Sequence, residues 1–203
     1  MNASTEAAKK LNLAIVGQGY VGLPLALLFA ESGCIVQAID VDSAKIDQLC
    51  DGRSYIKHIG SARVQQALSS GQFLPSTDFS SIHAADAVLI CVPTPLDEHH
   101  QPDMSYVVRT AQSIAPHLRQ GAVVILESTA YPGATEGILR EHLEAKSGLT
   151  AGQDFHLAFS PEREDPGNPL SEVKKIPKLV GGFTDACREK AVEVYSCAVD
   201  HLV

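Results

Sequence analysis

Short apolar runs alternate along the chain with longer segments whose apolar residues recur at helical spacing. The apolar runs are predicted to be buried strands and fall at 13–16, 35–39, 87–92, 122–126, 155–159 and 178–180. The segments between them are predicted to be helices and fall near 21–31, 43–49, 104–118, 134–146 and 184–197. Strands that are apolar on both faces need helices on both sides, so the pattern predicts an α/β fold with a doubly wound parallel sheet.

A glycine pattern joins the first predicted strand to the first predicted helix and consists of Gly17, Gln18, Gly19, Tyr20, Val21 and Gly22. With Asp40 closing the next strand, this is the fingerprint of a Rossmann-type dinucleotide-binding domain. Gly17 would permit the tight turn, Gly19 would let a pyrophosphate approach the backbone, and Gly22 would let the helix pack closely on the sheet. The partial positive charge at the helix N-terminus would attract the anion. A plain glycine turn is the alternative.

Asp40 is expected to accept hydrogen bonds from the adenosine ribose hydroxyls and to repel a 2′-phosphate. NAD is therefore predicted as the cofactor in preference to NADP. A helix cap or a solvated acid is the alternative for Asp40, although Ser43 is the expected cap of the helix that follows. Lys45, one turn into that helix, is expected either to reach the same ribose or to be an ordinary surface lysine.

The composition restricts the classes of function. Sixteen Lys and Arg stand against 24 Asp and Glu, and this net charge of −8 argues against a nucleic-acid backbone as partner but not against a small nucleotide held by backbone amides. No apolar run approaches the roughly 18 residues of a membrane span, and residues 1–10 form a polar tail without the features of a secretory signal. The scattered cysteines at 34, 50, 91, 187 and 197 indicate reduced thiols and a cytoplasmic location. The adjacent His99 and His100 are expected to be solvated, so no metal site is predicted.

Further motifs follow the glycine pattern in order. They are Gly-Tyr-Val-Gly-Leu-Pro-Leu-Ala at 19–26, Val-Pro-Thr-Pro at 92–95, Glu-Ser-Thr at 127–129 with Pro-Gly at 132–133, and Ser-Pro-Glu-Arg at 160–163 with Val-Gly-Gly at 180–182. Together they resemble the UDP-glucose/GDP-mannose dehydrogenase family from about residue 11 to the end of the sequence. The longer string at 160–168 resembles the UDP-N-acetylglucosamine 6-dehydrogenase branch, whereas UDP-glucose enzymes usually carry Phe where Arg163 stands.

The resemblance implies an oxidoreductase that uses NAD to convert the C6 alcohol of a UDP-N-acetylhexosamine, first of all UDP-N-acetylglucosamine, into a uronic acid for surface polysaccharides. UDP-glucose and UDP-N-acetylmannosamine are the alternative substrates. Thr94 is expected to face the cofactor, and Thr129 to contact it while positioning a catalytic water. Glu162 is expected to act as general acid/base and, with Arg163, to contact the substrate. Each of these residues also has a structural alternative. Thr94 would belong to a merely rigid proline loop, Thr129 would be a capping hydroxyl, and Glu162 and Arg163 would form surface ion pairs.

The cysteine nucleophile of that family has no counterpart in this sequence. In the family it stands in a Gly-Gly-Pro-Cys context, which none of the five cysteines matches. Residues 11–203 are therefore expected to be the NAD-binding N-terminal domain of a longer homodimeric or larger enzyme, inactive without the central helical and UDP-binding domains. Two other hypotheses stay open: a related β-hydroxyacid or 6-phosphogluconate-type dehydrogenase, and a stand-alone NAD-binding module that is not an enzyme.

Overall fold

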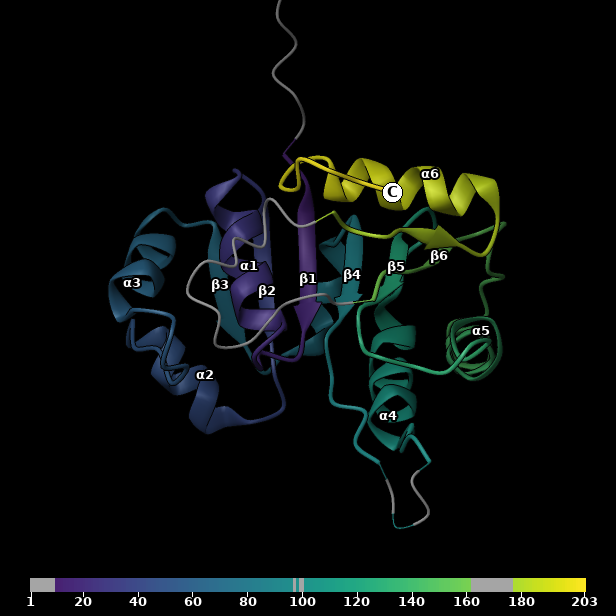
Figure 1. Cartoon of the computed structure of the whole chain (residues 1–203), viewed down its shortest axis with the longest axis horizontal. Coiled ribbons are helices and arrows are strands. Elements are labelled where there is room, and N and C mark those ends of the chain that lie inside the picture. The colour runs from purple at the N-terminus through teal and green to yellow at the C-terminus, as the bar shows by residue number, and fades with distance from the viewer. Residues whose placement is uncertain (1–9, 97, 99–100, 162–176) are drawn as a thin grey trace, which may run out of the picture.

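The computed structural model describes residues 10–96, 98, 101–161 and 177–203, and its centre is a seven-stranded sheet (Figure 1). The strands are β1 (Asn12–Val16), β2 (Ile35–Ile39), β3 (Phe73–Ser76), β4 (Ala87–Ile90), β5 (Val123–Leu126), β6 (His156–Phe159) and β7 (Gly181–Gly182). Their order across the sheet is β3-β2-β1-β4-β5-β6-β7, and every neighbouring pair is parallel except β6 and β7. The predicted doubly wound parallel sheet is confirmed, with one short antiparallel strand added at its edge.

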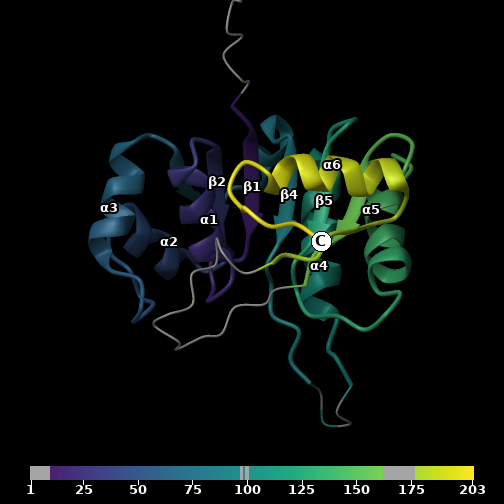
Figure 2. The same ribbon diagram turned by 45° about the horizontal axis from the view of Figure 1, so that its top comes forward.

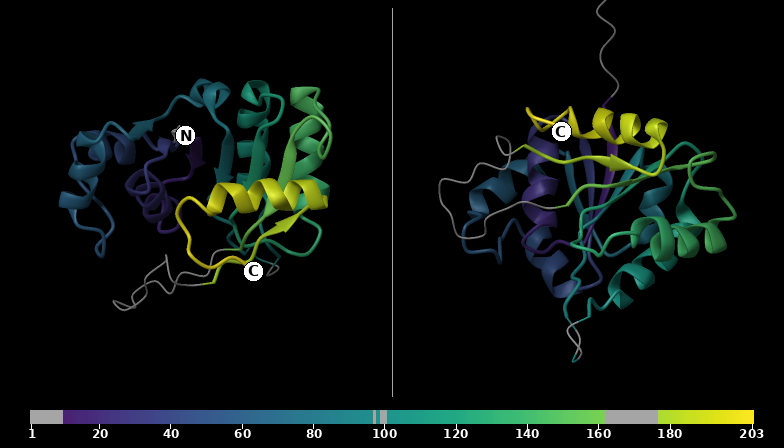
Figure 3. Two further views of the ribbon diagram at one scale, coloured as in Figure 1. Left: turned by 90° about the horizontal axis from the view of Figure 1, so that it is seen from above. Right: turned by 45° about the vertical axis from the view of Figure 1, so that its right-hand side comes forward.

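Helices cover both faces of this sheet. They are α1 (Gly22–Glu31), α2 (Ser43–Cys50), α3 (Ser61–Ser69), α4 (Ser105–Ile114), α5 (Arg140–Ser147) and α6 (Asp185–Tyr195), with short 3-10 helices at Phe79–Ala84 and Ala115–His117 and a π-helical turn at Thr135–Leu139. Seen from above, α1 and α6 lie on one side of the strands and α4 and α5 on the other (Figure 3). Among the described residues, no helix combines the length and the apolar character that a membrane crossing requires.

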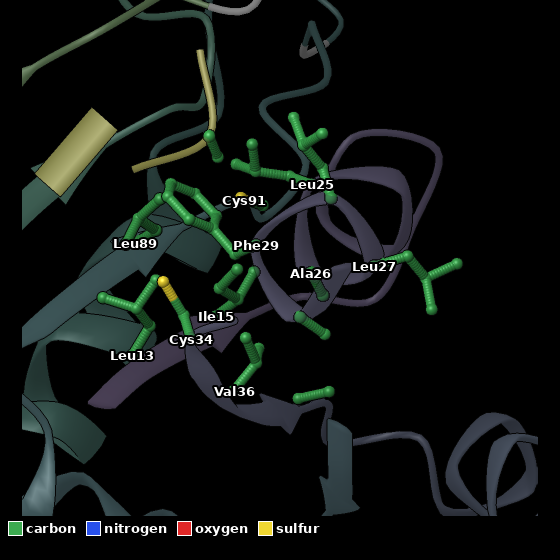
Figure 4. Packing of buried hydrophobic residues seen from close by; sticks show 14 of the residues in the cluster. Leu13, Ile15, Leu25, Ala26, Leu27, Phe29, Cys34, Val36, Leu89 and Cys91 are labelled. Atoms are coloured by element: carbon green, nitrogen blue, oxygen red, sulfur yellow. The ribbon is translucent and has the colours of Figure 1, made fainter. Parts of the chain in front are cut away.

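The strands divide their side chains between two hydrophobic clusters. In β1, Leu13 and Ile15 belong to the cluster beneath α1, whereas Ala14 and Val16 belong to the cluster beneath α4. This alternation follows from the two-residue period of a strand, and it explains why residues 13–16 are all apolar. Figure 4 shows the first cluster, where Phe29 of α1 packs against the side chains of β1.

The prediction of a sheet strand at 178–180 is wrong. These residues do not join the sheet, because their backbone pairs with residues 201–203 instead. The Lys178 amide donates to the His201 carbonyl and the Val180 amide to the Val203 carbonyl, each at 2.9 Å. The sheet strand in this region is β7, which follows directly and runs antiparallel to β6. The last residues of the chain thus turn back after α6 to lie beside this segment (Figure 2).

Two further differences concern the region after β2. Asp42, and not Ser43, caps α2, because its carboxylate accepts hydrogen bonds from the amides of Ala44 and Lys45. Helix α3 and strand β3 were not predicted from the sequence. Strand β3 contains Pro75, which lacks an N–H, and this composition obscured the strand at the edge of the sheet.

A buried charged network ties α6 to the end of β5. Glu127 is fully buried, and its Oε2 lies 2.8 Å from Nζ of Lys178. The Tyr195 hydroxyl donates to Oε1 of Glu127, and the Lys178 ammonium lies 5.1 Å from the centroid of the Tyr195 ring. Burial and the neighbouring carboxylate raise the pKa of Tyr195, so its hydroxyl stays protonated and serves as a donor. The network therefore holds the C-terminal segment against the motif at 127–129.

Replacing Lys178 by Met should lower the free energy of unfolding by about 3 kcal/mol, because the buried Glu127 carboxylate then loses its ion pair with Lys178. The matched control is Arg63→Met, which removes an ion pair with Glu31 whose side chains are 38% and 41% exposed. The control should cost at most about 1 kcal/mol. Urea denaturation of both variants measures the difference, and equal losses would contradict a special role for the buried pair.

Candidate functional site

A cavity of about 580 Å³ opens at the carboxyl ends of β1, β2 and β4. The chain leaves β1 toward β2 on one side of the sheet and returns to β4 on the other, so the strand order reverses at this point. Such reversals are where open α/β sheets bind their ligands. Several residues predicted from the sequence line the cavity: Gly17, Gly19, Tyr20, Val21, Asp40 and Lys45.

The three glycines of the pattern have separate physical roles. Gly17 has a φ of +94°, and a Cβ there would lie 2.6 Å from the carbonyl oxygen of Cys91. A Cβ on Gly22 would lie 1.7 Å from the carbonyl oxygen of Gly17, so the first turn of α1 can rest on β1 only without a side chain. A Cβ on Gly19 would meet nothing within 4 Å. The space beside Gly19 is open to the cavity, as an approaching anion would require.

Gln18 and Gly22 belong to the predicted cofactor set but do not line the cavity. The Gln18 side chain is fully buried, and its Nε2 donates to the Ile15 carbonyl at 2.7 Å. The Gln18 amide donates to Oδ2 of Asp40, also at 2.7 Å. Gln18 therefore supports the turn from inside rather than presenting its side chain to a ligand.

The carboxylate of Asp40 joins the glycine turn to the start of α2. Besides the Gln18 amide, it accepts the Asp42 amide at 3.0 Å and lies 3.3 Å from Nζ of Lys45. Only 7% of Asp40 is exposed, yet it lines the cavity. Asp40 is not the helix cap that was its alternative, since Asp42 fills that position. The structure places Lys45 on the cavity wall beside this carboxylate.

An apolar and aromatic wall of the cavity was not predicted from the sequence. It consists of Val41, Phe79, Tyr106 and the side chain of Arg109. Val41 is 81% exposed, and the Arg109 guanidinium lies 5.8 Å from the centroid of the Tyr106 ring. Flat apolar surfaces of this kind suit a planar heterocyclic ring. The sequence offered one signal for two of these residues: Tyr106 and Arg109 lie in the first half of α4, the helix that follows β4.

Thr94 and Thr129 meet at the ends of β4 and β5. Thr94 Oγ1 donates to the Thr129 carbonyl at 2.6 Å, and Ser128 Oγ donates to the Val92 carbonyl at 2.6 Å. These hydrogen bonds join the two loops, and Thr129 is exposed. Neither threonine lines the cavity, although Val92 and Pro93 of the same loop do.

The predicted substrate residues Glu162 and Arg163 lie outside the described residues, as do His99 and His100. Ser160, which directly follows β6, is fully buried. Within the described part of the chain, no group of three or more His, Cys, Asp or Glu side chains is arranged to hold a metal ion.

Comparison with known proteins agrees with this geometry. Residues 11–199 match the NAD binding domain of the UDP-glucose/GDP-mannose dehydrogenase family. The chain is 36% identical over 187 residues to the UDP-N-acetyl-D-glucosamine 6-dehydrogenase of Pseudomonas aeruginosa, covering 92% of this chain and 43% of that relative. It is 38% identical over 189 residues to the UDP-N-acetyl-D-mannosamine dehydrogenase of Escherichia coli (strain K12), covering 90% and 44%.

A solved structure supports the same relationship. The crystal structure of NDP-N-acetyl-D-galactosaminuronic acid dehydrogenase from Methanosarcina mazei Go1 superimposes with a TM-score of 0.87 at 33% identity, covering 96% of this chain and 44% of that one. The chain thus spans less than half the length of the relatives that it matches.

Gly22→Ala should lower the free energy of unfolding by about 3 kcal/mol, because the new methyl group would collide with the Gly17 carbonyl. Gly19→Ala is the matched control, since a methyl group there meets no neighbour. It should change the stability by no more than about 0.5 kcal/mol. Thermal and urea denaturation compare the two variants; a tolerated Gly22→Ala would mean that α1 does not need this close approach.

Proposed function

The chain belongs to the UDP-glucose/GDP-mannose dehydrogenase family, and we propose that it forms the NAD-binding part of an enzyme that oxidises the C6 alcohol of a UDP-N-acetylhexosamine to a uronic acid. The observation that carries the cofactor assignment is the cavity at the reversal of strand order, walled by the glycine turn and by Asp40. Residues 11–203 would be the cofactor domain, and residues 1–10 a polar tail.

The residues around the cavity fit NAD, which when bound supplies the acceptor for the hydride. The open space at Gly19 admits a pyrophosphate, and the N-terminus of α1 offers amide groups and a partial positive charge. This backbone site explains how a chain with a net charge of −8 can hold an anion. The carboxylate of Asp40 is placed to accept ribose hydroxyls, and Lys45 beside it offers a further donor.

The adenine ring would lie along the wall formed by Val41, Phe79 and Tyr106. Because Val41 and Tyr106 are partly exposed in the described structure, a ring placed there would bury apolar surface that now faces solvent. This end of the cavity also offers the Arg109 guanidinium for stacking on the ring.

The reacting end of the site is proposed to involve Thr94, Thr129, Glu162 and Arg163. Thr94 holds the loop of Thr129 through its hydrogen bond to the Thr129 carbonyl, which supports a positioning role in addition to contact with the cofactor. The exposed hydroxyl of Thr129 would position a water molecule, and Glu162 would move the proton of that water. Glu162 and Arg163 are proposed as substrate contacts from the motif at 160–163.

UDP-N-acetylglucosamine is the substrate that we propose first, because the string at 160–168 resembles that branch of the family. UDP-N-acetylmannosamine is the second candidate, because the Escherichia coli relative named for it has a similar identity. The family resemblance also supports a homo-oligomeric, cytoplasmic enzyme that supplies precursors of surface polysaccharides. NADH formation by the full-length protein with each sugar nucleotide, and with UDP-glucose, would separate the candidates.

The described chain should bind NAD at least about tenfold more tightly than NADP, because the Asp40 carboxylate accepts ribose hydroxyls and repels a 2′-phosphate. Asp40→Asn keeps the size of the side chain but removes its charge, so it should weaken NAD and reduce the preference. Calorimetric titration with both cofactors measures the change. Equal affinities of the unaltered chain for NAD and NADP would remove Asp40 from this role.

The 203-residue chain should bind NAD yet fail to oxidise any of the three UDP-sugars. Cys34, Cys91 and Cys187 are buried, and the exposed Cys197 donates its S–H to the Val194 carbonyl at 3.0 Å. Partial desolvation, together with nearby Asp47 and Asp51, raises the pKa of the other exposed thiol, Cys50, so that thiol is a poor nucleophile. Absorbance at the NADH band, at high protein concentration, provides the measurement. Sustained turnover would show that one of the five cysteines acts as the nucleophile after all.

A further inference from the structure

A tyrosine distant in sequence from the glycine pattern holds that pattern in place. The Tyr55 hydroxyl donates a hydrogen bond of 2.5 Å to the Gln18 carbonyl, across 37 residues of sequence. Tyr55 lies between α2 and α3, in a stretch where the sequence predicted no element and no site residue. Its contact with the cavity is indirect, because it touches the backbone behind the turn and does not line the cavity.

The segment that carries Tyr55 is itself fixed. Ile56 and Ile59 are buried in the same hydrophobic cluster as α1, and Tyr55 packs against that cluster. Ser54 receives the Ile56 amide on its hydroxyl, and its own amide donates to Ser61 Oγ at 3.0 Å. The phenol therefore reaches the glycine turn from a supported position, which reduces the entropy lost in forming its hydrogen bond.

The charges around Tyr55 keep it a donor. Burial, together with the carboxylates of Asp40 and Asp42, raises the pKa of the phenol, so the hydroxyl carries its proton at neutral pH. Asp40 meanwhile accepts the Gln18 amide. The two side chains thus bind both backbone groups of one residue: Asp40 accepts a hydrogen bond from the Gln18 N–H, and Tyr55 donates one to the Gln18 C=O.

This pair of contacts sets the direction of the next amide. In a trans peptide, the C=O of one residue and the N–H of the next residue point in opposite directions. Because the Gln18 carbonyl points to Tyr55, the Gly19 N–H points to the other side of the turn. Gly19 lines the cavity, and nothing lies within 4 Å of where its Cβ would be. Without Tyr55, this peptide has more freedom to rotate, because glycine tolerates a wide range of backbone angles.

We propose that Tyr55 is a positioning residue for a bound pyrophosphate: by holding the Gln18 carbonyl, it aims the Gly19 N–H into the cavity. The inference rests on the NAD binding in the proposed function, but not on the identity of the sugar substrate. It predicts a loss confined to ligands that carry a diphosphate, because the adenosine wall of the cavity is built from other elements.

Tyr55→Phe removes only the hydroxyl and is the variant to test in the 203-residue chain. Affinities for NADH by fluorescence, and for ADP-ribose and adenosine by competition with NADH, should be measured for the variant and the unaltered chain. Tyr55→Phe should weaken NADH and ADP-ribose by roughly three- to tenfold and change adenosine by less than about twofold. The comparison variant Tyr106→Ala, which alters the adenosine wall, should weaken all three ligands alike.

Unchanged NADH affinity in Tyr55→Phe, or an equal loss for all three ligands, would overturn the proposal. A second measurement needs no substitution: ADP-ribose, but not adenosine, should shift the NMR signal of the Gly19 amide in the unaltered chain. A Gly19 signal that ADP-ribose leaves in place would also overturn the proposal. If the unaltered chain binds no NADH, the proposed function itself fails. If the unaltered chain and Tyr55→Phe both bind NADH normally, only the role of Tyr55 fails.

Discussion

The close approach of α1 to the end of β1 is the constraint on which the rest of the site depends. The helix begins where Gly22 rests on the Gly17 carbonyl, at a distance that leaves no room for a Cβ. The N-terminus of α1 consequently lies at the carboxyl edge of the sheet, beside the reversal of strand order. Gly19, Tyr20 and Val21, which lead into α1, line the cavity, and the close approach at Gly22 fixes where the helix begins relative to them.

Two buried carboxylates at this edge of the sheet, Asp40 and Glu127, have different surroundings. Asp40 remains at the cavity wall and keeps its backbone partners behind it, so one of its faces is available to a ligand. Glu127 is turned wholly into the interior, where Lys178 and Tyr195 surround it. The sequence shows two acids that each follow a strand, and only the packing of Lys178 and α6 distinguishes the acid on the cavity wall from the one turned into the interior.

The sequence predicted those features that depend on local pattern. The apolar runs, the glycine turn and Asp40 after β2 identified the sheet and the cofactor side of the cavity, because each combines a short motif with its flanking elements. Features made by distant residues were missed. Tyr55 reaches Gln18 across 37 residues, and Phe79 lines the cavity from a short 3-10 helix whose sequence shows no clear period. The pairing of 178–180 with residues 201–203 in place of the sheet likewise joins segments that are separated in sequence.

The network around Glu127 also has a consequence for the order in which the molecule is assembled. Glu127 meets Lys178 and Tyr195 across 51 and 68 residues of sequence, whereas β1, α1 and β2 follow one another directly. During synthesis the N-terminal part of a domain leaves the ribosome first, so Glu127 is made 51 and 68 residues before these two partners. Strands β1, β2 and β4, at whose ends the cavity lies, can therefore pack together before the Glu127 carboxylate meets Lys178 and Tyr195. Helix α6 can dock only after it is made, so the end of β5 that leads to Thr129 gains its buried support later than the glycine turn does.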